Sequence, residues 1–130
     1  MALVHLVIAL ALAQFFVFGA AVGRARAKYG VAAPATTGNE MFERYFRVQM
    51  NTLELLVMFV PAVWLFAEYV SAAVAAALGA LFIVGRGVYF LAYVKDPAKR
   101  GPGFGLSVLP TVLLLIGAIY GAVRASLHHP

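Results

Sequence analysis

The sequence predicts an all-α protein whose helices cross a membrane four times and pack as a four-helix bundle. Its 130 residues are 64% hydrophobic and only 12% charged, whereas about a quarter of the residues of a soluble domain are charged. Four apolar stretches approach the length of about 20 residues that a membrane helix requires. They occupy most of the chain, so we expect a single integral membrane domain over residues 1–130.

The first membrane span is expected at residues 2–23, which carry no formal charge apart from the titratable His5. A signal peptide is the competing interpretation, because Ala25-Arg26-Ala27 loosely resembles a cleavage site. No basic segment precedes the apolar stretch, however, and the stretch is too long for a signal-peptide core. We therefore interpret residues 2–23 as a membrane helix.

The other three spans follow in order along the chain. The second is expected at residues 45–67, and Thr37 or Asn39, in the turn-forming segment before it, could cap its helix. The third is expected at residues 70–94, directly after a very tight turn. The fourth, at residues 104–123, follows a break rich in lysine, proline and glycine.

The connecting segments predict the orientation in the membrane. Residues 24–47 hold five basic and two acidic residues, residues 95–100 hold three basic and one acidic, and the turn between the second and third spans has only Glu68. By the positive-inside rule, the first and third connections are cytoplasmic and both termini lie outside. The net charge of +5 is then explained by topology and by contact with membrane lipids. We expect no nucleic-acid partner, since no aromatic–basic pattern accompanies the charge.

Cysteine and histidine usage restricts the chemistry. The chain has no cysteine, so it forms no disulfide and offers no thiolate metal ligand or cysteine nucleophile. Its three histidines, His5, His128 and His129, lie near the ends and have no metal-ligand spacing to a carboxylate. We therefore expect no metal site, and any thiol chemistry would use the sulfur of a substrate.

Polar residues form a stripe along the second span. A charged side chain inside a membrane helix costs several kcal/mol unless it is paired or faces water, so each one is a candidate functional group. Arg44, Arg47, Asn51 and Glu54 fall at i, i+3, i+7 and i+10. At about 100° per residue these positions share an arc of about 80°. The stripe runs from the cytoplasmic end into the bilayer.

The third span carries a second stripe. Arg86, Tyr89 and Tyr93 fall at i, i+3 and i+7, and Arg100 has the same phase if the helix continues past Pro97. Two such stripes that meet at the cytoplasmic end would form a basic pocket. Tyrosine hydroxyls and a single carboxylate would line it.

A purely structural role for these groups is the alternative. Glu54 could pair with Arg47 or Arg86 and join two helices, and Arg44 fits a topology or snorkelling role. For Asn51 with Glu54, both interpretations stay open. One carboxylate cannot neutralise the four arginines of the two stripes, however, so the surplus positive charge favours an anionic ligand.

These residues resemble the signature of the MAPEG superfamily, the membrane-associated proteins in eicosanoid and glutathione metabolism. The superfamily includes microsomal glutathione transferases, leukotriene-C synthases and prostaglandin-E synthases. The resemblance covers nearly the whole chain, because length, number of spans and orientation match as well. The matching pattern is Phe42-Glu43-Arg44-x-x-Arg47-x-Gln49-x-Asn51-x-x-Glu54, then Arg86-x-x-Tyr89-x-x-x-Tyr93, and Arg100 seven residues later.

The resemblance implies a homotrimer that binds glutathione between neighbouring protomers near the cytoplasmic face. It implies that Glu54 binds the γ-glutamyl ammonium group, while arginines and tyrosines bind the two carboxylates. Arg26 matches an arginine contributed by the adjacent subunit, and Arg100 matches the catalytic arginine that stabilises the glutathione thiolate. The implied glutathione-binding residues are Arg26, Arg44, Arg47, Gln49, Asn51, Glu54, Arg86, Tyr89 and Tyr93.

The resemblance favours a membrane-bound glutathione transferase, with glutathione peroxidase activity as a further expectation. The second substrate would be a lipophilic electrophile or a lipid hydroperoxide that enters from the bilayer; leukotriene or prostaglandin synthesis stays open. Two departures concern the site: Leu55 stands where several relatives have tyrosine, and Pro97 alters the loop that carries Arg100.

Two other classes of function are alternatives. The main alternative is a non-catalytic lipid-binding or scaffold protein of the same fold, although such members lack much of this polar set. A small transporter or channel subunit is the other, but the chain has no pair of broken helices and no charge in its first and fourth spans.

Overall fold

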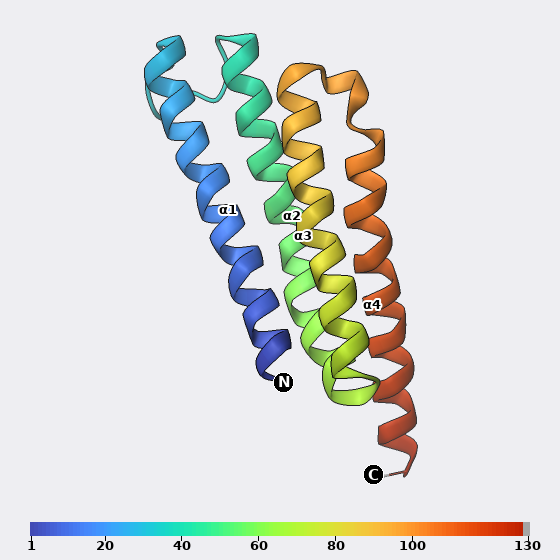
Figure 1. Ribbon diagram of the computed structural model, residues 1–130. Helices are drawn as coiled ribbons and strands as arrows, with labels where there is room; N and C mark the ends of the chain where they lie inside the picture. The colour runs from blue at the N-terminus through green and yellow to red at the C-terminus, as the bar shows by residue number, and fades with distance from the viewer. Residues whose placement is uncertain (129–130) are drawn as a thin grey trace.

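The computed structural model describes residues 1–128 and shows four long helices packed as a bundle (Figure 1). Each of the four is long and apolar enough to cross a membrane. No strand occurs in the described residues. The predicted all-α transmembrane four-helix bundle is therefore confirmed. The helices are α1 (Ala2–Tyr29), α2 (Glu40–Tyr69), α3 (Ala72–Lys95) and α4 (Gly101–His128), and a short 3-10 helix, η1 (Pro97–Lys99), joins α3 to α4.

The helices α2 and α3 form the centre of the bundle. α1 packs against both from one side and α4 packs against both from the other (Figure 1). The α1–α2 loop and η1 lie at one end of the bundle, which we call the loop end. The α2–α3 turn, the start of α1 and the end of α4 lie at the opposite, turn end. His129 lies outside the described residues.

Side-chain caps fix where the helices begin. The Asn39 side chain accepts a hydrogen bond from the backbone N–H of Phe42 at 3.0 Å, so Asn39, and not Thr37, caps α2. At the other end of α2, the hydroxyl of Ser71 accepts a hydrogen bond from the backbone N–H of Val74 at 3.1 Å. This cap begins α3 at Ala72 and explains the tight turn between the two helices.

At the loop end, α1 and α2 extend beyond the apolar spans expected from the sequence. α1 continues to Tyr29 and ends at Gly30, whose φ of 69° is a left-handed conformation that glycine adopts without strain. α2 already begins at Glu40. The charged residues in these added turns are long, straight side chains that favour a helix. Charged groups therefore project from regular helices at this end.

The helix α3 ends at Lys95 and does not continue through Pro97. Asp96 has an extended backbone, and its carboxylate accepts a hydrogen bond from the backbone N–H of Ala98 at 3.1 Å, which begins η1. The chain reverses there, so Arg100 lies at the junction of η1 and α4 and not on an extension of α3.

Apolar side chains fill the space between the helices in the half of the bundle nearer the turn end, the turn half. The rings of Phe59 on α2 and Phe82 on α3 stack with their centroids 3.9 Å apart. A Cβ atom on Gly79 would clash with Val7 and would lie 3.6 Å from Val63. Gly79 therefore allows α1 and α2 to approach α3 closely, as small residues do between membrane helices.

Candidate functional site

A buried arginine joins α2, α3 and α4. Arg86 is only 1% exposed, and its Nε and Nη2 donate hydrogen bonds to the Thr52 hydroxyl at 3.2 and 2.9 Å. Its Nη1 donates to the Ser107 hydroxyl at 3.1 Å. Within residues 1–128 no carboxylate lies at ion-pair distance from Arg86. Because an arginine side chain stays protonated, a positive charge is held here by neutral partners.

Tyr89 lies beside this arginine. The centroid of its ring is 4.0 Å from Cζ of Arg86, a cation–π contact, and its hydroxyl accepts a hydrogen bond from Asn51 Nδ2 at 2.7 Å. Its ring centroid also lies 5.4 Å from that of Tyr93. A Cβ atom on Gly103 would clash with the backbone of Tyr89, so α4 lies directly against α3 here.

These groups border a hollow of about 260 Å³ between α2, α3 and α4, which we call the central hollow. Glu54 and Arg100 are exposed on this chain and Arg86 is buried, so the hollow has two accessible charged groups and one enclosed. Arg100 Nη1 donates to the Pro97 carbonyl at 3.1 Å, and this bond steadies the exposed side chain. The lining residues are Asn51, Glu54, Leu55, Met58, Arg86, Tyr89, Arg100 and Phe104.

A second hollow of about 410 Å³, the rim hollow, opens at the loop end. Arg44 forms an ion pair with Glu40 at 3.0 Å, and its Nη1 donates to the carbonyls of Val94 and Lys95 at 3.1 and 2.9 Å. Arg44 therefore ties α2 to the end of α3, whereas Arg47 is exposed. The hollow is lined by Thr36, Thr37, Glu40, Glu43, Arg44, Phe46, Arg47, Tyr93 and Pro97.

The structure places most of the predicted site residues around these two hollows and two of them elsewhere. Gln49 faces α1, because a Cβ atom on Gly19 would lie 3.0 Å from its Nε2. Arg26 donates to the Ala35 carbonyl at 2.7 Å, and its Cζ lies 4.8 Å from the ring centroid of Phe42. One chain alone therefore does not bring Arg26 and Gln49 to the hollows. The residues around the hollows are Arg44, Arg47, Asn51, Glu54, Arg86, Tyr89, Tyr93 and Arg100.

The hydroxyl partners of Arg86 were not predicted. Glu54, which the structural alternative pairs with Arg47 or Arg86, forms an ion pair with neither in the part of the chain that the structure describes. Thr52 and Ser107 take that place. The available signal was a hydroxyl in an otherwise apolar span, since such groups commonly form hydrogen bonds between membrane helices.

The fold and these hollows define a class of protein, a four-helix membrane bundle with arginine-lined hollows in its loop half. Residues 4–120 match the MAPEG family. Microsomal glutathione S-transferase 2 of Homo sapiens is 41% identical over 103 residues, which cover 78% of this chain and 70% of that protein. Leukotriene C4 synthase of Cavia porcellus is 32% identical over 118 residues, 85% of this chain and 79% of that protein.

A third relative is an uncharacterized protein of Synechocystis sp., which is 51% identical over 114 residues. The match covers 88% of this chain and 83% of that protein. The chain therefore belongs to the MAPEG family, and the resemblance found in its polar stripes is confirmed.

Proposed function

We propose that this protein is a membrane-bound glutathione transferase that activates the glutathione thiol for attack on lipophilic electrophiles. The observation that carries the proposal is the uncompensated charge of Arg86, enclosed beside the Asn51–Tyr89 pair in a hollow that Glu54 and Arg100 also line. Glutathione has two carboxylates and one ammonium group, so its site needs surplus positive charge and one carboxylate. Relatives named as a glutathione S-transferase and a leukotriene C4 synthase support this choice of ligand.

The two hollows suggest how the tripeptide lies. Glu54 is the carboxylate of the central hollow and suits the γ-glutamyl ammonium group. Arg47 and Tyr93, in the rim hollow, suit a carboxylate of the ligand. Arg44 and Arg86 are already held by protein partners, so we assign them mainly an electrostatic role in the walls.

A homotrimer would complete the site. The central hollow, at about 260 Å³, is smaller than the range of about 300–1,000 Å³ typical of ligand sites. Arg26 and Gln49 lie away from the hollows of their own chain, and both are only partly buried in it. We therefore propose that these two residues reach the glutathione bound by an adjacent protomer.

The chemistry follows from the electrostatics of the thiol. A free thiol has a pKa near 8.5, so only a few per cent of it is thiolate at neutral pH. A guanidinium group beside the sulfur favours the thiolate, and the proton leaves to water. We assign this role to Arg100. The thiolate then forms a sulfur–carbon bond with the electrophile, and the leaving group departs with its bonding electron pair. This scheme needs no cysteine of the protein, and the chain has none.

We further propose that the loop end faces the cytoplasm and that both termini lie outside. The basic residues gather in the α1–α2 and α3–α4 connections, as the positive-inside rule requires of cytoplasmic segments. The lipophilic substrate would reach the central hollow from the bilayer.

Activity measurements on the purified full chain test the proposal. Conjugation of glutathione to a halonitroarene should fall at least about tenfold in Arg100→Ala, as losses of a transition-state charge partner commonly do. Lys99→Ala, which removes an exposed neighbouring charge that lines neither hollow, should keep the parent rate. Turnover of a lipid hydroperoxide would add peroxidase activity. Glutathione binding without turnover of any substrate would favour a lipid-binding or scaffold protein, and absence of both would reject the proposal.

A further inference from the structure

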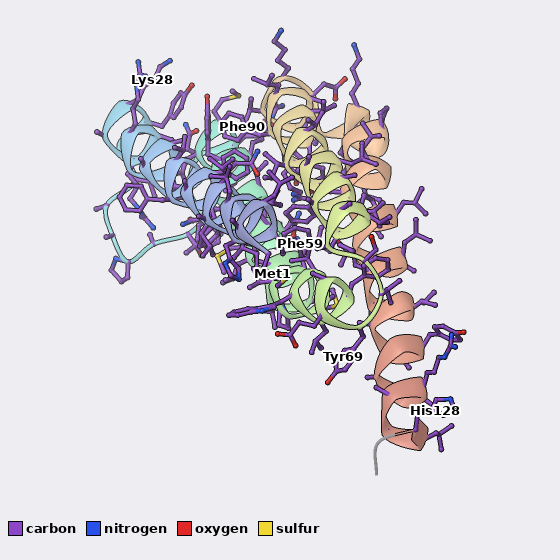
Figure 2. All side chains as sticks on the ribbon, turned by 60° about the horizontal axis from the view of Figure 1, so that its bottom comes forward. Met1, Lys28, Phe59, Tyr69, Phe90 and His128 are labelled. Carbon is purple, nitrogen blue, oxygen red and sulfur yellow. The ribbon has the colours of Figure 1, made fainter. Side chains whose placement is uncertain are left out.

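A third hollow, separate from the proposed glutathione site, lies between α1, α2 and α3 at the loop end. Its volume is about 500 Å³, within the range of ligand sites. Figure 1 shows α1 leaning away from α3 toward this end, and Figure 2 places Phe90 between the two helices with Lys28 at the end of α1. We call it the α1 groove; its lining residues are Val17, Ala20, Ala21, Arg24, Ala25, Lys28, Tyr29, Tyr45 and Phe90.

The inner part of the groove is apolar. Phe90 stacks on Phe18 of α1, with ring centroids 4.8 Å apart, and meets Tyr45 edge-on at 5.8 Å. Ala20 and Ala21 are small, so space remains between α1 and this aromatic group. The groove is therefore an unfilled space whose walls are aliphatic side chains and aromatic rings.

The groove ends in a pair of cations. Arg24 and Lys28 are one helical turn apart on α1, and both are exposed. Neither forms an ion pair within residues 1–128. Because they occupy the last turns of a membrane helix, they lie where the hydrocarbon of a bilayer meets its headgroups. The groove is thus apolar along its length and positively charged at its mouth, which is the pattern that an anionic amphiphile matches.

The groove faces away from the protomer contact proposed above. At about 100° per residue, Arg24 and Lys28 each project about 160° from Arg26 around α1. Arg26 turns toward the α1–α2 loop, where it donates to the Ala35 carbonyl. A neighbour that Arg26 reaches would therefore leave the groove open to lipid. Deeper in the membrane, Gln14 Nε2 donates to the Ile83 carbonyl at 2.9 Å and holds α1 against α3.

We propose that the α1 groove is a binding site for an anionic phospholipid of the leaflet at the loop end. Arg24 and Lys28 would bind the phosphate by charge-assisted hydrogen bonds, and one acyl chain would lie against Ala21 and Phe90. The protein would thus bind an anionic phospholipid at a site separate from its proposed glutathione site.

Lipid titrations with native mass spectrometry test this site on the purified full chain. Phosphatidylglycerol should bind more tightly than phosphatidylcholine. The double variant Arg24→Gln/Lys28→Gln should weaken phosphatidylglycerol binding about 25-fold, the product of about fivefold for each cation near an anionic lipid. The matched control Lys95→Gln/Lys99→Gln removes two exposed cations of the loop end that lie outside the groove and should retain the parent affinity.

A second variant separates a groove from a charged surface. Ala21→Phe fills the apolar wall without changing charge and should also release the lipid, whereas Ala77→Phe, on an exposed position of α3 outside the groove, should not. The charge-preserving swap Arg24→Lys/Lys28→Arg should keep binding and so controls for folding. Equal loss in the Lys95/Lys99 control, unchanged binding in Ala21→Phe, or equal affinity for the two lipids would each overturn the proposal. None of these measurements uses glutathione, so their outcome tests the lipid site independently of the proposed activity.

Discussion

The turn half and the loop half of this bundle bury different kinds of side chain, aromatic rings in one and a charged arginine in the other, to the same extent. In the turn half, Phe59 and Phe82 are fully buried and stack on each other, and Gly79 brings the helices together. In the loop half, Arg86 is just as enclosed, but it bonds two hydroxyls and borders the central hollow. Apolar contacts stabilise a membrane bundle, whereas an enclosed charge without a counter-charge is unfavourable for stability. The proposed site therefore lies in the half of the bundle that encloses the charge.

The largest loss of stability is expected from a bulky side chain at Gly79, where α1 and α2 approach α3 closely. Gly79→Leu would force a side chain into Val7 and Val63, and we expect a loss of about 3 kcal/mol or failure to fold. Thermal unfolding in detergent, followed by circular dichroism, measures the effect. Gly23→Leu is the matched control, since nothing lies within 4 Å of a Cβ atom at that glycine. Equal stability of the two variants would contradict the account of the turn half.

Two glutamates of α2 allow the halves to be compared within one helix. Glu54→Ala should weaken glutathione binding about 10-fold to 100-fold, since hydrogen bonds to charged groups contribute about 1.5–3 kcal/mol. Glu68→Ala, at the turn end of the same helix, should leave the affinity unchanged. Equilibrium dialysis with labelled glutathione measures both. A similar loss in the two variants would show that the effect is not local to the central hollow.

Arg86 itself should separate stability from binding. Arg86→Met removes an enclosed charge that has no carboxylate partner, so the unfolding free energy should stay level or rise by about 1 kcal/mol while glutathione binding falls at least tenfold. Thr52→Val keeps the charge but removes its hydroxyl partner, and should lower the unfolding free energy by about 1–3 kcal/mol. Strong destabilisation by Arg86→Met would mean that this arginine is mainly structural.

The smallest effect is expected at the rim. Glu40 pairs with Arg44 across one helical turn and is largely exposed, and such pairs contribute about 0.2–1 kcal/mol. Glu40→Ala should therefore change the unfolding temperature little, because Arg44 keeps its bonds to the α3 carbonyls. Glu43→Ala gives the comparison, because Glu43 forms no ion pair within residues 1–128. A large drop in the unfolding temperature of Glu40→Ala alone would show that this exposed ion pair stabilises the fold more than expected.

The sequence predicted the features that depend on one helix. Periodicity placed Asn51 and Glu54 on one face of α2, and the structure puts both at the central hollow. Capping chemistry narrowed the start of α2 to Thr37 or Asn39, and Asn39 is the cap.

The features that depend on contacts between helices were not predictable in the same way. Which hydroxyl meets Arg86 depends on how α2 and α4 approach α3, which periodicity does not specify. The α1 groove depends on the angle between α1 and α3 and on small residues that any membrane helix contains. The position of Arg100 depends on the cap by Asp96, which reverses the chain at Pro97. Helix phase aligns this arginine with the α3 stripe only if the helix continues past Pro97, and α3 ends at Lys95.

The central claim is that the surplus guanidinium charge at the loop end receives glutathione and ionises its thiol. The ultraviolet absorbance of the thiolate measures this directly when glutathione is titrated into the purified protein at neutral pH. We expect a saturable signal in the parent chain, reduced in Arg100→Ala by loss of ionisation and in Glu54→Ala by loss of binding. A parent protein that gives no thiolate signal at saturating glutathione would contradict the account.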